Sequence, residues 1–515
     1  MLEALSFIYP MLDLQPATFE DFAREAEGGN VVPIVRTVLA DLQTPVSAFL
    51  RIAGGGPYAF LLESVEGGER VARYSFLGAD PEMIVRGHGQ ETVVQRGDKT
   101  ELREGISAIN YVRDYVRRRS LAHRRNLAPM AGGAVGYLAY TAARWFEPAL
   151  GGEENISRRD EAVFMFYRTV LAFDRVRQQI AITSVVFTDE AEEDHTRLRE
   201  LYEAAVGQTE KIEQALLSDP LPRSASPART GGKDGETPAS FSSNWSREDF
   251  ESAVETIKEH IAAGDCYQAV LSQRLTKRVT ARPIDIYRAL RVLNPSPYMY
   301  FLRLGDEAIV GASPEMLVRC RGQRLDYRPI AGTRRRGATE TEDWLLGEEM
   351  RSDEKEVAEH MMLVDLGRND LGRVADYGSV EVADLMTIER YSHVQHLVTI
   401  LKARLRDTLD CFDALAACFP AGTVTGAPKV RAMQIIGELE PNSRGVYAGA
   451  VLYMDYAQNL DSCIAIRTIV LHEGRAEVQA GAGIVADSVP ELEYEETLNK
   501  ARALLRAIEM AEQGL

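Results

Sequence analysis

The chain has few cysteines, and their spacing supports no common cysteine site. The five cysteines are odd in number and none forms a Cys-x-x-Cys pair, which argues against a thiolate zinc site and a disulfide framework. A reducing, cytoplasmic compartment fits this usage best. No apolar run approaches the roughly 18 residues of a membrane span, and the first residues lack the basic start of a signal peptide. We therefore expect neither export nor a membrane anchor.

Basic residues are fewer than acidic residues. The chain carries 59 Lys and Arg against 77 Asp and Glu, a net charge of −18. Such a field repels anionic lipid and the phosphate backbone of nucleic acid, so we expect no nucleic-acid partner and no membrane partner. An anionic ligand would have to be held by local cations, a metal ion or backbone amides.

Several common enzyme motifs are absent. Neither Gly481–Gly483 nor Gly422–Lys429 fits the phosphate-binding loop or the Rossmann fingerprint, which disfavours nucleotide binding. The chain has no Gly-x-Ser-x-Gly elbow, and no cysteine stands in a Gly-x-Cys-x-Gly turn. Acyl transfer by Ser or Cys is therefore disfavoured.

The 515 residues are enough for about three domains, or for two large ones. Residues 218–243 are rich in Pro, Gly and Ser and predict a flexible linker between an N-terminal region, 1–217, and a second domain, 244–515. The N-terminal region is predicted to be mixed, with β-rich segments at 58–64 and 169–187 and helical segments near 106–118 and 194–217.

The second domain opens with an amphipathic helix. Ser246 and Asp249 predict a capping box, and apolar residues recur at helical spacing until Gly264. Residues 267–279 then alternate faces as a strand does. Further strands are expected at 308–312, 325–330, 446–454, 463–471 and 476–480, and helices at 353–366, 428–439 and 490–512. Consecutive strands followed by separate helices predict antiparallel sheets in an α+β fold.

Two pairs of glutamates stand three residues apart on predicted helices. Glu356 pairs with Glu359, and Glu493 pairs with Glu496, so each pair shares a helix face. Magnesium binds carboxylate oxygens and keeps several waters, and two such helices facing each other would suit it. Solvated helix faces give this spacing more often. Lys500, one turn beyond Glu496, is equally an ordinary salt-bridge partner.

Three further polar features predict a ligand less specifically. Arg467 lies in an otherwise apolar predicted strand, where a guanidinium needs a carboxylate from the protein or from a ligand. The glycines of Gly481–Gly483 let backbone amides approach a carboxylate or phosphate closely. His393 and His396 are close together but lack the neighbours of a zinc site. One of them fits acid–base chemistry or a structural role.

Four motifs, taken in order, resemble the chorismate-utilising enzymes. They are Pro329–Arg334 (PIAGTR), Asp353–Asp370 (with DEKE and HMMLVDLGRND), Gly426–Lys429 (GAPK) and Gly481–Gly483 (GAG). The resemblance covers essentially all of residues 245–515, the N-terminal region more loosely, and is closest to the anthranilate synthase branch. It implies a layered α+β sandwich of two large, mostly antiparallel sheets flanked by helices.

The resemblance also implies how the substrate, chorismate, is bound. Magnesium (Mg2+) would lie between the two helices and hold the ring carboxylate. The implied ligands are Glu359 and Glu496, with Glu356 and Glu493 in or near the shell. The implied contacts of the other carboxylate are Tyr447, Arg467 and the amides of Gly481, Ala482 and Gly483. Lys500 corresponds to a residue near the metal and the substrate carboxylate.

The same resemblance assigns the proton transfers. Glu315 corresponds to the general acid that protonates the departing ring hydroxyl, so it must be protonated and needs a raised pKa. Thr423 and His396 correspond to residues that line the ring. His396 is implied in proton transfer during loss of pyruvate.

Two positions separate the branches of the family. Isochorismate and salicylate synthases carry a lysine that activates water where this chain has Gln268, which cannot deprotonate water at neutral pH. Aminodeoxychorismate synthases typically carry a nucleophilic lysine where this chain has Ala331. The remaining reaction adds ammonia to chorismate and eliminates pyruvate to give anthranilate. The alternatives are an aminodeoxychorismate or 2-amino-2-deoxyisochorismate synthase and a catalytically silent, tryptophan-responsive binding subunit.

Partners follow from the same resemblance. The chain shows no glutaminase triad, so ammonia is expected from a separate glutamine amidotransferase subunit. A tryptophan feedback site is implied where the two regions meet, with Ser64, Pro297, Tyr298 and Met299 as ligands. A strand with a polar end and a Pro-rich turn are the plainer interpretations of those residues.

Overall fold

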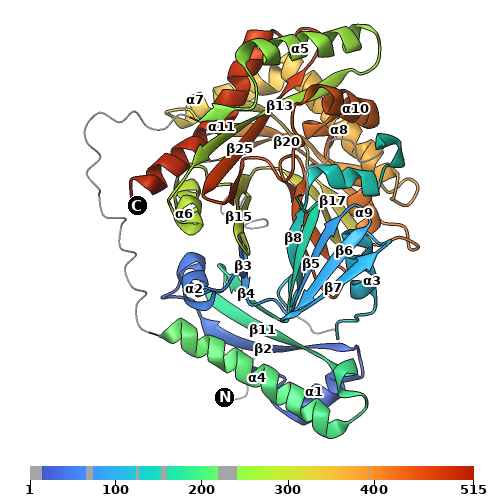
Figure 1. The fold of residues 1–515 in the computed structure, drawn as a ribbon, viewed down its shortest axis with the longest axis vertical. Helices are drawn as coiled ribbons and strands as arrows, with labels where there is room; N and C mark the ends of the chain where they lie inside the picture. Colours follow the sequence, from blue (N-terminus) through green and yellow to red (C-terminus); the bar gives the residue numbers. More distant parts are fainter. Residues whose placement is uncertain are drawn as a thin grey trace.

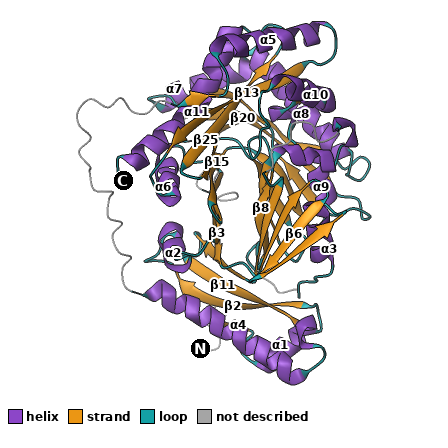
Figure 2. Cartoon of the chain, in the orientation of Figure 1, coloured by secondary structure: helices purple, strands orange, loops and turns teal. Residues whose placement is uncertain are grey.

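The computed structural model describes residues 14–64, 73–122, 127–151, 159–218, 241–391 and 394–514. Strands in this part of the chain form two antiparallel sheets, of 13 and 12 strands, with helices on their outer sides (Figures 1 and 2). The predicted α+β sandwich of two large antiparallel sheets is therefore confirmed. Most of the predicted linker and His393 lie outside the described residues, and the division into domains stays a prediction.

The 13-stranded sheet contains strands from both ends of the chain. Its order is β1 (Leu14–Gln15), β2 (Val31–Leu39), β11 (Gln179–Phe187), β10 (Thr169–Asp174), β4 (Tyr74–Ala79), β3 (Tyr58–Glu63), β14 (Tyr298–Leu304), β15 (Glu307–Ser313), β24 (Thr468–His472), β25 (Arg475–Ile484), β13 (Gln268–Arg278) and β12 (Ser242–Ser243), with β21 (Gly426–Ala427) beside β13. The pairing of β3 with β14 joins the two halves of the chain, with Glu63 opposite Met299.

The 12-stranded sheet is mixed in the same way. Its order is β18 (Ile330–Arg335), β20 (Val394–Arg404), β17 (Arg324–Tyr327), β16 (Met316–Arg321), β23 (Leu460–Ile464), β22 (Ala450–Met454), β8 (Gly133–Leu138), β9 (Ala162–Tyr167), β5 (Met83–His88), β6 (Glu91–Arg96) and β7 (Lys99–Glu104), with β19 (Glu381–Arg390) beside β20. Here β8 pairs with β22, which again joins the two halves.

Helices cover the outer faces of both sheets. They are α1 (Phe19–Ala26), α2 (Pro45–Ile52), α3 (Ala108–Arg117), α4 (His195–Leu217), α5 (Arg247–Ala262), α6 (Pro283–Leu293), α7 (Glu340–Ser352), α8 (Glu354–Gly372), α9 (Cys411–Cys418), α10 (Lys429–Leu439) and α11 (Pro490–Glu512), with short 3-10 turns η1 (Tyr140–Trp145), η2 (Pro148–Leu150), η3 (Thr188–Ala191) and η4 (Gly422–Val424). No helix in the described ranges is long and apolar enough to cross a membrane.

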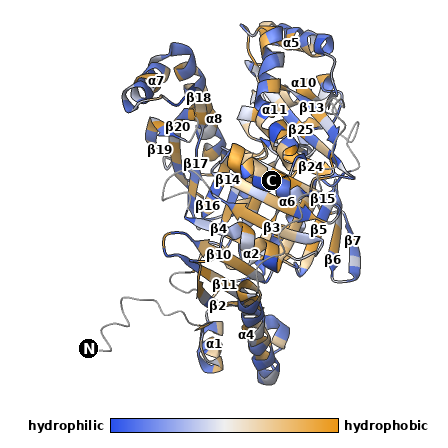
Figure 3. Cartoon of the chain, turned by 90° about the vertical axis from the view of Figure 1, so that its left-hand side faces the viewer, coloured by the Kyte–Doolittle hydropathy of each residue, from blue (hydrophilic) through white to orange (hydrophobic). Residues whose placement is uncertain are grey.

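The three largest hydrophobic clusters of the described residues form layers. One cluster lies between the sheets, where Phe60 and Tyr300 of one sheet pack with Val135 and Met165 of the other. A second lies under α2, α6 and α11, and a third under α3, α8 and α9. The strands in the middle of the molecule are mainly hydrophobic, whereas α7 at its edge is mainly hydrophilic (Figure 3). Burial on both faces of each sheet explains why many strands show no simple alternation.

Elements with strong local signals lie where the sequence predicts them. Helix α11 begins at Pro490 and ends at Glu512, as expected. Helix α5 begins after Ser246, whose hydroxyl accepts a hydrogen bond from the Asp249 amide at 3.0 Å, and Gly264 follows it with a φ of +82°.

Three predicted strands are wrong in their extent. The strand expected at 463–471 is two strands, because β23 ends at Ile464 in one sheet and β24 begins at Thr468 in the other. The strand at 325–330 is likewise split between β17 and β18. The strand at 446–454 begins only at Ala450. In the first case the chain bends where no glycine signals it, because each half joins a different sheet. In the second case both halves pair with β20, and Pro329 lies between them.

Candidate active site

The candidate site is built around the end of β25. Strand β24 pairs with β25 only as far as Val478, so the following residues pair with β13 on one side alone. The partners of Gly481 and Gly483 on β13 are Ser272 and Val270, but their amides donate elsewhere, to Glu440 and to the Thr425 carbonyl, both at 2.8 Å. In an antiparallel ladder such residues direct their own N–H groups away from the partner strand. The amides of Gly481 and Gly483 therefore point to the open edge of the sheet.

Two side chains predicted for the site, Tyr447 and Gln268, lie directly over these glycines. A Cβ atom at Gly481 would lie 2.8 Å from the Tyr447 hydroxyl, and one at Gly483 would lie 2.4 Å from Gln268 Nε2. A side chain at Gly481 would also lie 2.9 Å from the Leu271 carbonyl oxygen, whereas one at Gly483 would have to displace the Gln268 amide. Burial raises the pKa of Tyr447 to about 12, so its hydroxyl stays protonated and can donate a hydrogen bond to an anion at this edge.

Arg467 lies at a crossover between the sheets. It stands between β23 and β24, not within a strand, with a φ of +50°. Its carbonyl accepts a hydrogen bond from the Ala312 amide at 3.1 Å. Within the described residues its guanidinium has no ion pair closer than 4.0 Å, burial lowers its pKa, and the charge that opposes this shift is Glu315. A guanidinium held this way suits the carboxylate of a ligand.

Glu315 lies at a second crossover, beside the first. It connects β15 to β16, and its carbonyl accepts from the Ile464 amide at 3.1 Å. Burial raises the pKa of the Glu315 carboxyl to about 7, although the neighbouring Thr423 and the charges of Arg467 and Lys500 oppose the shift. The raised pKa that a general acid requires is therefore present in this structure.

His396 is held as a neutral imidazole. Its Nδ1 lies 2.7 Å from the Gly332 carbonyl oxygen and 3.2 Å from Thr333 Oγ1. Because a carbonyl oxygen only accepts, Nδ1 carries the proton and Nε2 keeps its lone pair. Burial lowers the pKa of the imidazole. Nε2 is thus able to accept a proton at neutral pH.

The four predicted metal ligands lie on α8 and α11. Burial raises the pKa of Glu359, and the charges of Glu356 and Glu496 add to the shift. Burial and the charge of Glu496 raise the pKa of Glu493 in the same way. These carboxylates are therefore close enough to repel one another, and a divalent cation would reverse that effect.

The same carboxylates have protein partners. Arg334 Nη1 lies 2.7 Å from Glu356 Oε1, and Lys500 Nζ lies 2.7 Å from Glu496 Oε1. The ordinary i,i+4 salt bridge of Lys500 is thus present, while its ammonium also donates to the Gly481 carbonyl at 3.0 Å. Across the described part of the chain, no three acidic, histidine or cysteine side chains are arranged to hold a metal ion.

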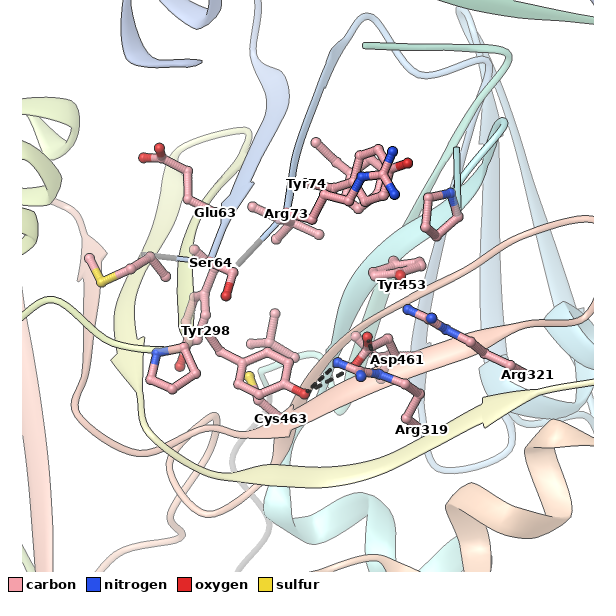
Figure 4. A pocket seen from close by; sticks show the side chains of 18 of the residues that line it. Glu63, Ser64, Arg73, Tyr74, Tyr298, Arg319, Arg321, Tyr453, Asp461 and Cys463 are labelled. Atoms are coloured by element: carbon pink, nitrogen blue, oxygen red, sulfur yellow. Dashed lines mark hydrogen bonds and ion pairs between the residues drawn. The ribbon is translucent and has the colours of Figure 1, made fainter. Parts of the chain in front are cut away.

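A separate cavity of about 500 Å³ lies between the sheets. It is lined by all four predicted tryptophan ligands: Ser64, Pro297, Tyr298 and Met299. Ser64 follows β3 and Tyr298 begins β14, so residues from both halves of the chain line the cavity. The Tyr298 hydroxyl donates to Asp461 at 3.2 Å, and Asp461 pairs with Arg319 at 2.7 Å (Figure 4). The buried Ser64 hydroxyl has no hydrogen-bond partner among the described residues.

The profile of the chorismate binding enzyme family matches residues 57–506. The chain belongs to this family. Among its relatives, "Anthranilate synthase component 1" of Acetivibrio thermocellus is 44% identical over 503 residues, with 98% of this chain and 99% of that protein covered. The protein of the same name from Pseudomonas putida is 44% identical, with 96% and 99% covered.

Solved structures agree with this assignment. The crystal structure of anthranilate synthase component I from Streptococcus pneumoniae has a TM-score of 0.71 and 35% identity, and covers 91% of this chain and 98% of that one. The menaquinone-specific isochorismate synthase of Escherichia coli has a TM-score of 0.67 at 20% identity, with 95% and 97% covered. The second comparison supports the fold alone.

Sequence reasoning about this chorismate-binding enzyme missed two buried ion pairs. One is Arg319 with Asp461 in the cavity, and the other is Arg444 with Glu440, whose side chains are 1% and 5% exposed. Arg319 and Asp461 stand in otherwise apolar strands, which is the signal that singled out Arg467. Arg444 and Glu440 lie in a polar loop after α10, and nothing local distinguishes them there.

Proposed function

We propose that this chorismate-binding enzyme is an anthranilate synthase component I, which adds ammonia to chorismate and eliminates pyruvate to give anthranilate. The observation that carries the proposal is the buried Glu315, with a pKa of about 7, beside Arg467 and Thr423. An acid that is protonated near neutral pH is what loss of the ring hydroxyl requires. Relatives of that name, 44% identical over nearly the whole chain, support it.

Different residues of the site carry substrate binding and proton transfer in the proposed reaction. Arg467, the Tyr447 hydroxyl and the amides of Gly481–Gly483 bind one carboxylate of the substrate. Ammonia adds to the ring while Glu315 gives its proton to the departing hydroxyl, which leaves as water. His396 Nε2 then accepts a ring proton as the C–O bond to the enolpyruvyl group breaks and the ring becomes aromatic, and the enolate that leaves takes up a proton on carbon to give pyruvate. The amide nitrogen of Gln268 lies over Gly483. Because an amide is not a base at neutral pH, Gln268 takes no proton in this scheme.

The donor set of α8 and α11 fits magnesium, because carboxylate oxygens are the ligands it prefers. Glu359 and Glu496 would hold it, with Glu356 and Glu493 in or near the shell. The raised pKa values of Glu359 and Glu493 support this, since neighbouring carboxylates gain most from a cation. When bound, the ion supplies the positive charge that holds the ring carboxylate.

The name "component 1" of the relatives implies a second component. We assign that role to a glutamine amidotransferase subunit that supplies ammonia.

We assign the 500 Å³ cavity to tryptophan as a feedback inhibitor. Ser64→Phe should fill the cavity with a ring and weaken tryptophan inhibition by on the order of 100-fold or more, while kcat changes less than about twofold. Ser64→Ala, which removes only a hydroxyl, should weaken it by about tenfold. The measurement is the inhibition constant of tryptophan at fixed chorismate. Normal inhibition in Ser64→Phe would place the regulatory site elsewhere.

The proposed reaction is tested by incubating the purified chain with chorismate, magnesium and ammonium at slightly alkaline pH. A fluorescent product with the mass of anthranilate, dependent on metal and ammonia and suppressed by tryptophan, is expected. Isochorismate, aminodeoxychorismate or 2-amino-2-deoxyisochorismate would keep the family and overturn the roles given to Gln268, to Ala331 or to the elimination step. No product would favour a silent binding subunit.

A further inference from the structure

The buried ion pair of Arg444 and Glu440 contacts three parts of the candidate site but does not lie at the open edge of β25 itself. Arg444 and Glu440 lie in the loop between α10 and β22, four residues apart. Arg444 Nε and Nη2 donate to the two carboxylate oxygens of Glu440 at 2.9 and 2.7 Å. Both side chains are almost fully buried, at 1% and 5% exposure.

The remaining donors of Arg444 fix two backbone segments. Arg444 Nη1 donates to the Val424 carbonyl at 2.7 Å, within the η4 turn that carries Thr423. Arg444 Nη2 also donates to the Val270 carbonyl of β13 at 2.6 Å. Val270 lies opposite Gly483. One guanidinium therefore fixes the Thr423 turn against the strand that carries Gln268.

Glu440 strengthens the hold on the same strand. Its Oε1 accepts from the Ser272 amide at 2.8 Å and from the Ser272 hydroxyl at 2.7 Å. The Ser272 amide faces away from β25, as the N–H of Gly481 opposite it faces away from β13, and Glu440 is the acceptor for it there. The carboxylate thus anchors β13 at the residue that lies opposite Gly481.

The guanidinium also lies between two aromatic rings. Its Cζ atom is 4.7 Å from the ring centre of Tyr140 and 5.6 Å from that of Tyr447. Cation–π contacts at these distances hold a ring in place. The Tyr447 hydroxyl is the group that lies over Gly481.

We propose that the Arg444–Glu440 ion pair positions the active site. It fixes the Thr423 turn, strand β13 and the Tyr447 ring relative to one another. The proposal rests on the proposed function. Stability alone gives little reason for such a pair, because apolar residues of the same volume often replace a buried ion pair without loss. Its four directed hydrogen bonds to two segments instead give geometric precision.

The test compares Arg444→Lys and Glu440→Gln with Asp413→Asn. Lysine keeps the charge but cannot span the two carbonyls and the carboxylate together. Asp413→Asn weakens another ion pair, Arg113 Nη2 to Asp413 Oδ2 at 2.5 Å, which joins α3 to α9 and touches none of the groups named above. All three variants should lower Tm. Arg444→Lys should also lower kcat/KM for chorismate by about 10- to 100-fold, whereas Asp413→Asn should not.

A shift in the pH profile separates positioning from simple destabilisation. Thr423 lowers the pKa of Glu315, so loosening its turn should raise that pKa and move the loss of activity to higher pH in Arg444→Lys. The tryptophan inhibition constant should stay unchanged, since Arg444 does not line that cavity. A wild-type pH profile together with a kcat/KM loss no larger than that of Asp413→Asn would overturn the proposal. Glu440→Gln, which keeps the shape of the side chain, gives the same comparison if the lysine variant does not fold.

The two proposals fail separately. If the wild-type chain makes no anthranilate, the proposed function is wrong, and the positioning role is then tested by chorismate binding without ammonia. Arg444→Lys should weaken that binding by about tenfold or more. Equal dissociation constants in the variant and the wild type would reject the positioning role.

Discussion

Glu359→Gln and Glu496→Gln are each expected to abolish turnover, with kcat at least on the order of 1000-fold lower and the fold intact. Glutamine keeps the shape of the side chain but removes the charge that a magnesium ion requires. The two side chains lie on different helices, α8 and α11, yet they are close enough for the charge of Glu496 to raise the pKa of Glu359. Either substitution should therefore prevent binding of the same magnesium ion.

Matched controls lie on the same helices. Glu495→Gln removes an exposed carboxylate that pairs with Arg247 at 3.0 Å, and Glu354→Gln removes one from the first turn of α8. Both should stay within about twofold of wild type, as surface charges usually do. Magnesium binding, measured by calorimetry without substrate, should weaken in Glu359→Gln and Glu496→Gln only. Unchanged activity in both of these variants would remove the metal assignment.

Glu315→Gln is expected to lower kcat by about 100- to 10,000-fold, the usual contribution of a general acid. An amide cannot give a proton to the leaving hydroxyl. Chorismate binding should change little, because Arg467 and the glycine amides remain. Glu307→Gln is the control, since Glu307 lies on the same connection of β14 to β16 and burial also raises its pKa, yet it is remote from Glu315 at the other end of β15.

The wild-type pH profile provides a second measurement of the same group. Glu315 must be protonated to act, and its pKa is raised to about 7. The active, protonated form of Glu315 is fully populated below this pH, so activity at a constant concentration of free ammonia should show a limb that falls as the pH rises through about 7. The falling limb should be absent from the residual activity of Glu315→Gln. If the limb persists unchanged in that variant, another group is the acid.

Sequence alone predicted the elements whose ends are set locally. Proline at the first turn of α11 and the Ser246 cap of α5 act within four residues of the helix start, so they can be read without knowledge of the fold. The carboxylate pairs were visible for the same reason, because helical spacing places them on one face.

The errors lie where long-range pairing decides the structure. The stretch Cys463–Thr468 reads as one continuous apolar strand, yet its two halves pair with β22 and β16 in one sheet and with β15 and β25 in the other. No propensity encodes such a change of partner. Arg444 could not be singled out either, because its acceptors lie 20 and 174 residues away along the chain.

The crossover at Arg467 also limits how the length of this chain can vary. Only three residues, Ala465–Arg467, separate the end of β23 in one sheet from the start of β24 in the other. Because side chains alternate along a strand, one inserted or deleted residue here would turn every following side chain of β24 to the opposite face unless the loop absorbed it. Related genes should therefore tolerate substitutions at this point but not changes in length, in contrast to the segments that join surface helices.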